Sequence, residues 1–82
     1  MLQCMVVTPE KAILDEQAEL VVLPMIDGEL GVQSGRSALV GRLGKGQLRL
    51  THNRQVKILN IEGGFAQVRS NVITVLTSKV TG

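Results

Sequence analysis

Hydrophobic residues occur along this chain in short runs, and glycine, proline or small polar residues separate one run from the next. Segments 47–51 and 65–69 alternate between polar and apolar residues, apart from Phe65 at the start of the second, which predicts strands with one buried face. The residues expected on that face are Leu48, Leu50, Ala66 and Val68. Turn signals recur about every 8–12 residues, so we expect an all-β fold, a small sandwich or barrel.

The apolar runs predict nine strands, at residues 2–8, 11–15, 18–26, 30–32, 38–43, 47–51, 56–61, 65–69 and 72–76. Turns are expected at Glu16–Gln17, at 44–46 and at 52–54. Pro24 has no N–H to donate, so we expect it at an edge or a bulge. The alternation slips at Leu59, which predicts a bulge or a strand covered on both faces.

The chain has 82 residues, so we expect one domain, 1–82, with an adequate core but little stability to spare. Phe65 is the only aromatic residue, which leaves no stacking platform for bases. Cys4 is the only cysteine and lies in an apolar run, so it is interpreted as a small buried hydrophobe. The longest apolar run, Leu20–Ile26, contains a proline, so neither a signal peptide nor a membrane span is expected.

Charge is distributed unevenly along the chain. Residues 1–29 hold six of the seven acidic residues and one basic residue, whereas residues 36–82 hold eight basic residues and one acidic residue. Two interpretations are open, namely two solvated faces or a polarised module that docks in one orientation on a charged partner. Runs that are apolar on both faces leave a similar choice, between a partner surface and simple burial between sheets.

No residue pattern in the chain is typical of catalysis, or of cofactor or metal binding. Gly44 and Lys45 are followed by glycine, where a phosphate-binding loop requires serine or threonine. His52 is the only histidine, and a metal site needs more ligands than that. Asp27 and Glu29 lack a third polar group for acid–base catalysis. We therefore expect a binding or structural module with no catalytic, cofactor or metal residues.

The most distinctive stretch is glycine-rich and runs from Asp27 to Val40. The pair Asp27-Gly28 is a tight-turn signal, because glycine accepts a positive φ without steric cost. Gly31 and Gly35 extend that conformational freedom over a whole loop. A loop of this kind beside two strands is typical of a hairpin tip or of a contact surface.

This stretch and several others resemble the epsilon-subunit family of F-type ATP synthases. The similar pieces, in the same order and spacing, are Val6–Lys11, Asp27–Val32, Gly35, Leu39, Glu62–Val68 and Asn71–Leu76. The resemblance covers nearly the whole chain. It implies a small all-β sandwich of about ten short, mostly antiparallel strands. It also implies a non-catalytic central-stalk subunit that turns with the rotor.

The resemblance further implies two partners, the gamma subunit and the membrane-embedded c-ring, and no bound small molecule. Such a subunit couples ion-driven ring rotation to ATP synthesis or hydrolysis, as a peripheral protein on the cytoplasmic face of the inner (plasma) membrane. The family's c-ring contact carries over to Asp27, Gly28, Glu29, Leu30 and Gly31. The candidates for the gamma contact are Arg36, Gly63, Gly64 and Phe65.

The chain departs from the family pattern in two places. Where the family usually has Leu-Pro-Gly-His-Ala-Pro-Leu, residues 33–39 lack both prolines and have Arg36 for the histidine. We expect a more flexible free loop, because proline presets φ. Typical members also continue into a helical hairpin, whereas this chain ends at Gly82. Two explanations are open, namely a naturally short form or a truncated chain. As it stands, we expect the chain to have no inhibitory arm and no nucleotide site.

An alternative from another class is a stand-alone sandwich that binds a small ligand or a carbohydrate. Such a module needs a concave site on which polar or aromatic groups converge. The chain has one phenylalanine and neither tryptophan nor tyrosine, which makes this alternative the weaker of the two.

Overall fold

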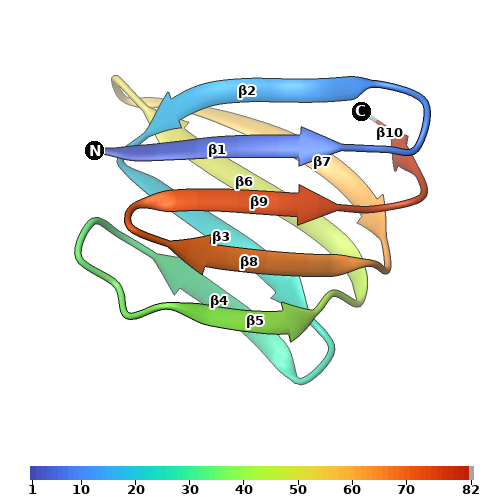
Figure 1. The fold of residues 1–82 in the computed structure, drawn as a ribbon. Coiled ribbons are helices and arrows are strands. Elements are labelled where there is room, and N and C mark those ends of the chain that lie inside the picture. Colours follow the sequence, from blue (N-terminus) through green and yellow to red (C-terminus); the bar gives the residue numbers. More distant parts are fainter. Residues whose placement is uncertain (82) are drawn as a thin grey trace.

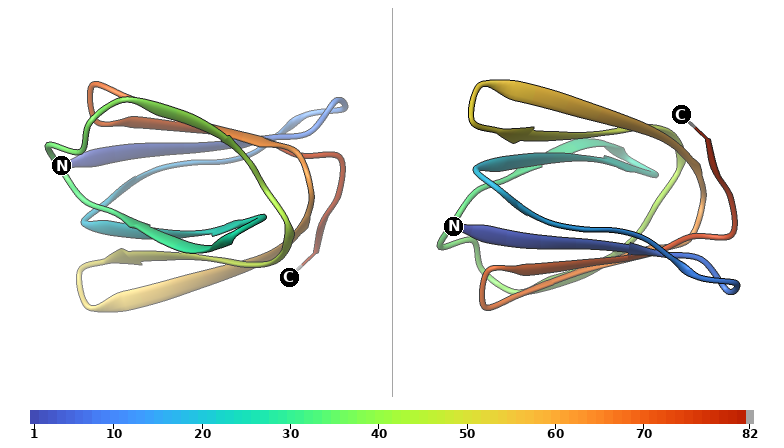
Figure 2. Two further views of the ribbon diagram at one scale, coloured as in Figure 1. Left: turned by 90° about the horizontal axis from the view of Figure 1, so that it is seen from below. Right: turned by 90° about the horizontal axis from the view of Figure 1, so that it is seen from above.

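The computed structural model describes residues 1–81 as ten strands in two sheets that pack face to face (Figures 1 and 2). The strands are β1 (Leu2–Val7), β2 (Ala12–Ala18), β3 (Leu20–Met25), β4 (Gly28–Val32), β5 (Leu39–Arg42), β6 (Lys45–His52), β7 (Gln55–Glu62), β8 (Phe65–Arg69), β9 (Val72–Leu76) and β10 (Val80–Thr81). The predicted domain end, Gly82, lies outside the described residues.

The two sheets have five strands each. Sheet A has the order β2-β1-β9-β8-β5, and sheet B has the order β10-β7-β6-β3-β4. Within residues 1–81 every strand pair is antiparallel except β1 with β9. The prediction of a small all-β sandwich of about ten short, mostly antiparallel strands is therefore confirmed.

The hydrophobic core lies between the sheets, where alternate residues of each strand point inward. The residues predicted to face inward are all buried, namely Leu48, Leu50, Ala66 and Val68. Cys4 is buried as well, as expected of a small hydrophobe. This burial, with smaller contributions from the charges of Glu16 and Asp15, raises the pKa of the Cys4 thiol to about 12. Cys4 is therefore an uncharged core residue at neutral pH.

Two predicted turns are wrong. Glu16 and Gln17 belong to β2, and the chain turns at Glu19 instead. Glu16 stays in the strand because it pairs with Cys4 in the β1–β2 ladder. Its carboxylate also forms an ion pair with Lys57 of β7, which links sheet A to sheet B. The second error concerns Lys45 and Gly46, which are the first residues of β6 rather than a turn.

The bulge predicted at Leu59 is also wrong. β6 and β7 pair without a shift along the whole of β7. Leu59 faces the core, while Val56 and Ile58 lie on the outer face of sheet B and are exposed. The sequence slip therefore reflects apolar residues on both faces of a regular strand, and the outer ones are uncovered in this chain.

Pro24 lies where β3 has β4 as its partner. The pairing of β3 with β6 covers Leu20 to Val22, whereas Pro24 pairs with Glu29 of β4. The proline therefore lies where the β3–β6 ladder is interrupted rather than at a free edge, because its carbonyl oxygen accepts the Gly44 N–H at 2.8 Å and the next residue, Met25, bridges to Leu43. A strand tolerates proline there because no ladder bond to β6 is lost.

Candidate functional site

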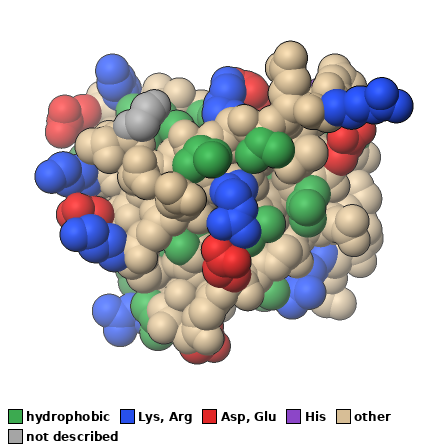
Figure 3. Space-filling view, turned by 180° about the vertical axis from the view of Figure 1, so that it is seen from behind, with side chains coloured by type: hydrophobic (Ala, Val, Ile, Leu, Met, Phe, Trp, Pro, Cys, Tyr) green, Lys and Arg blue, Asp and Glu red, His purple; other side chains and the backbone are tan. Residues whose placement is uncertain are grey.

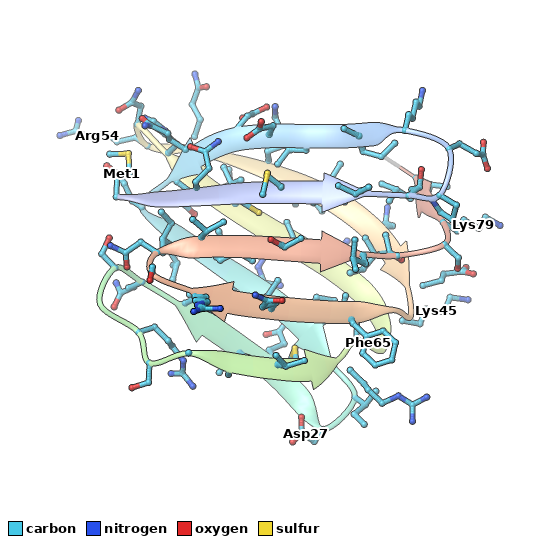
Figure 4. The ribbon with its side chains drawn as sticks, in the orientation of Figure 1. Met1, Asp27, Lys45, Arg54, Phe65 and Lys79 are labelled. Atoms are coloured by element: carbon cyan, nitrogen blue, oxygen red, sulfur yellow. The ribbon has the colours of Figure 1, made fainter. Side chains whose placement is uncertain are left out.

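The glycine-rich stretch forms the hairpin between β3 and β4. Ile26 and Asp27 are its two turn residues, and Ile26 is 63% exposed. Gly28 follows with φ +129, a conformation that side chains rarely adopt. The Ile26 N–H donates to the Arg42 carbonyl oxygen of β5 at 3.1 Å, which ties the turn to sheet A. Figure 4 places Asp27 at the outer end of this hairpin.

Glu29 is bound within the chain. Arg49 of β6 donates from Nη1 to Glu29 Oε2 at 2.9 Å and from Nη2 to Oε1 at 3.2 Å. Hydrogen bonding to Arg49, together with the charge of that guanidinium, lowers the pKa of Glu29. Sequence reasoning missed Arg49, because β6 is far along the chain and β3 lies between it and β4.

The other predicted hairpin residues differ in exposure. Gly28 and Gly31 are exposed, whereas Leu30 is half-buried and packs against the core. Four of the five predicted c-ring residues are thus at the surface, and Leu30 anchors them. The hairpin also lines an open groove of about 490 Å³, together with Leu39–Arg42 of β5. In Figure 1 these two edge strands, β4 and β5, run along the same side of the sandwich.

The loop from Gln33 to Ala38 leads from sheet B to sheet A and carries the exposed Arg36. Its Gly35 N–H donates to Asn71 Oδ1, in the turn between β8 and β9, at 2.8 Å. The Arg36 N–H donates to the Gln33 carbonyl oxygen at 3.3 Å. The Asn71 side chain therefore constrains a loop that lacks both family prolines, and sequence reasoning did not identify it.

Gly63 and Gly64 form a packed corner between β7 and β8. Both have positive φ, +68 and +110, and a Cβ on Gly64 would lie 2.0 Å from the Leu76 carbonyl oxygen. The hydroxyl of Thr77, which is buried, donates to the Gly63 carbonyl oxygen at 2.8 Å. These two glycines connect β7 of sheet B to β8 of sheet A. The next residue, Phe65, has an exposed side chain.

Exposed apolar side chains lie on the outer face of sheet A. Phe65 is 54% exposed, and its register partner Leu76 and the nearby Val40 are also exposed. We call Val40, Phe65 and Leu76 the sheet A patch. Arg36 is not part of it, because Asn71 holds the Arg36 loop at one end of β8 while Phe65 begins the strand at the other. The structure thus places Gly63, Gly64 and Phe65 together and Arg36 apart from them.

The outer face of sheet B carries the second exposed set. Figure 3 faces this sheet and shows a basic and an acidic group side by side near its middle, with hydrophobic side chains around them. Arg49 and Glu29 form an ion pair in this sheet. Val22 of β3 and Ile58 of β7 flank Arg49 in the register. Val56, two residues before Ile58 and on the same face of β7, is 57% exposed.

We searched residues 1–81 for a metal site and for a membrane-spanning helix. Across residues 1–81 no group of three or more His, Cys, Asp or Glu side chains is placed to hold a metal ion. No helix in that part of the chain is long and apolar enough to cross a bilayer. Fold and surface together define a class, a small two-sheet β-sandwich with exposed apolar side chains on both outer faces and a glycine-rich edge hairpin.

The family within that class follows from sequence comparison. Residues 1–81 match the family described as "ATP synthase, Delta/Epsilon chain, beta-sandwich domain", and the chain belongs to this family. It is 51% identical over 78 residues to the ATP synthase epsilon chain of Rhodopirellula baltica, covering 95% of this chain and 61% of that protein. Identity to the Synechococcus sp. epsilon chain is 34% over 74 residues, covering 90% and 54%. The chain therefore spans a little over half the length of these relatives.

Solved structures agree on the fold. A chain in the cryo-EM structure of the Euglena gracilis mitochondrial ATP synthase (OSCP/F1/c-ring) superposes with a TM-score of 0.91, at 24% identity, over 98% of this chain and 52% of that one. A chain of the Tetrahymena thermophila mitochondrial ATP synthase central stalk and c-ring gives 0.81, at 18% identity, over 98% and 65%. The two-sheet sandwich is therefore a fold that ATP synthase chains have.

Proposed function

We propose that this chain acts as a non-catalytic central-stalk subunit of an F-type ATP synthase. It binds the gamma subunit and the c-ring and turns with them as one body. The observation that supports this proposal is the family match over residues 1–81, with relatives named ATP synthase epsilon chain. The subunit then lies at the cytoplasmic face of the inner (plasma) membrane, held there through the complex.

The mechanism we infer is mechanical. A torque-transmitting element needs two separate contact surfaces on a body that does not deform. The closely packed core between the sheets provides stiffness, because protein interiors are packed like organic crystals. The β3–β4 hairpin at the edge of sheet B and the outer face of sheet A provide the two surfaces, which adjoin at Val40 in the groove between β4 and β5.

The c-ring contact is assigned to the β3–β4 hairpin, with Asp27, Gly28, Glu29, Leu30 and Gly31. Support comes from the geometry of the hairpin tip, where Ile26 and Asp27 project and the tie to Arg42 limits their movement. A hairpin held in this way loses little conformational entropy when it docks.

The gamma contact is assigned to the sheet A patch, with Phe65 as its central side chain. Exposed apolar clusters of this kind mark interaction sites, and aromatic residues are enriched among the side chains that dominate binding. Gly63 and Gly64 contribute by holding the strand that carries Phe65. Arg36, which was also predicted for this contact, lies apart from the sheet A patch, near the far end of β8.

Co-purification tests the proposal. We expect the chain and a gamma subunit from the same source to form a stable one-to-one complex in size-exclusion chromatography with light scattering. Phe65→Ser should weaken that complex about tenfold. The matched control is Val56→Ser, which removes a similarly exposed apolar side chain, 57% against 54%, from the outer face of sheet B. Absence of a complex with a folded gamma subunit would refute the proposal, and equal weakening by both variants would refute the assignment to sheet A.

A further inference from the structure

The two carboxylates of the β3–β4 hairpin have different surroundings. Glu29 accepts two hydrogen bonds from Arg49, one on each oxygen. Asp27, in the two-residue turn, takes part in no ion pair or side-chain hydrogen bond with residues 1–81. One carboxylate is therefore already satisfied inside the chain, and the other is available.

Arg49 is well placed to hold Glu29. It lies near the middle of β6, in register with Val22 on one side and Ile58 on the other, and its side chain is half-buried. The planar guanidinium fixes the carboxylate through two parallel bonds, a geometry that a single point charge does not impose. The contact spans β3, so it links the edge strand β4 to the middle of sheet B.

This pairing changes what a partner meets at the hairpin. A cation that approaches Glu29 also approaches Arg49, whose positive charge cancels most of the attraction. Asp27 carries its charge at the outer end of the hairpin (Figure 4), beside the exposed Ile26. The hairpin therefore presents one effective negative charge next to one apolar side chain.

We propose that Arg49 is a positioning residue that takes up the charge of Glu29, so that Asp27 is the hairpin carboxylate that meets a cationic group of the docking partner. The partner segment that fits is a polar loop with a lysine or arginine beside an apolar side chain. This inference rests on the proposed function only in assuming that the hairpin contacts the c-ring.

The experiment titrates the complex of this chain and gamma with detergent-solubilised c-ring at low and high salt. Asp27→Asn should weaken ring binding about two- to fivefold at low salt and flatten its salt dependence. Glu29→Gln should also weaken it, because it leaves the positive charge of Arg49 unpaired beside the hairpin. Arg49→Gln should strengthen binding about two- to fivefold at low salt, because it frees the Glu29 carboxylate. Arg49→Lys, which keeps a positive charge, should strengthen it less than Arg49→Gln.

Glu19→Gln is the matched control, because it removes an exposed carboxylate just before the other end of β3 and should leave ring binding unchanged. A merely structural role of Arg49 predicts weaker binding by Arg49→Gln, so a gain separates the two roles. Unchanged binding with Asp27→Asn, or no gain from Arg49→Gln, would overturn the inference. Failure of the wild-type complex to bind the ring would instead count against the proposed ring contact itself.

Discussion

Two glycine-rich motifs of this chain look alike in sequence and differ in what their glycines contact. One is the hairpin 27–31 and the other is the corner 62–65. A Cβ added to Gly28 would find no heavy atom within 4 Å, whereas one added to Gly64 would lie 2.0 Å from the Leu76 carbonyl oxygen. Both glycines have positive φ, so backbone conformation alone does not distinguish them.

The difference indicates two separate reasons for glycine. In the hairpin, Gly28 permits a tight turn that projects Asp27 from the edge of sheet B. In the corner, Gly64 permits two backbone segments to touch, and its carbonyl oxygen accepts the Leu43 N–H at 2.8 Å. A substitution in the corner therefore acts on the fold first, whereas one in the hairpin acts mainly at the surface.

Gly64→Ala should have the largest effect on stability. The added methyl group would clash with the backbone at Leu76, and alanine would also be strained at φ +110. Strain and overpacking together should lower the free energy of unfolding by about 3 kcal/mol or more. Urea denaturation with linear extrapolation measures this loss.

The paired variant is Gly28→Ala, which has the same backbone strain without the clash. It should cost about 1 kcal/mol. Equal losses in the two variants would mean that the close approach at Gly64 is unimportant, and the distinction between the two motifs would then fail.

Thr77→Val should have the next largest effect, again at the corner. The buried hydroxyl donates to the Gly63 carbonyl oxygen at 2.8 Å, and valine keeps the shape while it removes the donor. We expect a loss of about 1–2 kcal/mol in the free energy of unfolding. Thr77→Ser, which keeps the hydroxyl, should lose less in the same urea titration. A larger loss with serine than with valine would show that the methyl group matters more than the hydrogen bond.

The strands were largely predictable from the sequence, because inward positions such as Leu48 and Val68 repeat with the period of a strand. The errors have physical reasons. Glu16 was assigned to a turn as a charged residue, but its partner Lys57 is distant in sequence and near only in the folded sandwich. The apparent slip at Leu59 arose because Ile58 is apolar but faces outward. The sequence around an apolar residue does not show whether it faces the core or the outer surface of the sheet.

The turn of the candidate hairpin was predictable from the sequence, but the contacts of the hairpin and its neighbouring loop were not. The tight turn at Asp27-Gly28 followed from local backbone preferences, which sequence encodes directly. The partners Arg49 and Asn71 were missed, because a hydrogen bond between distant strands depends on sheet order and register. Gly63 and Gly64 were assigned to a contact surface, although the close backbone approach at Gly64 also demands glycine and leaves the same sequence signal.

Asn71→Gly should have a smaller effect, in the loop that joins the hairpin to sheet A. Asn71 has φ +64, so glycine keeps the turn and removes only the bond to the Gly35 N–H. We expect a loss of about 1 kcal/mol in local stability. Amide hydrogen exchange at Gly35 measures it and should become about five times faster.

Asn71→Ala is the matched variant, because it removes the same hydrogen bond and adds strain at positive φ. It should destabilise the turn between β8 and β9 more than glycine does, while Gly35 exchanges at a similar rate in both. Unchanged exchange at Gly35 in both variants would mean that the loop is held by other contacts.

The pH dependence of Glu29 should be the smallest effect. Arg49 holds the pKa of Glu29 below its usual value of about 4.3, so the folded chain binds this proton less readily than the unfolded chain. The stabilisation is therefore present above the unfolded pKa and is lost as pH falls through the folded pKa. Unfolding of wild type and Glu29→Gln, compared from pH 7 down to about pH 3, should give curves that converge at the acid end. The Arg49→Gln curve should converge with that of wild type in the same way, because this variant removes the same ion pair. An Arg49→Gln curve that keeps a constant distance from wild type would show that the pair is not the cause.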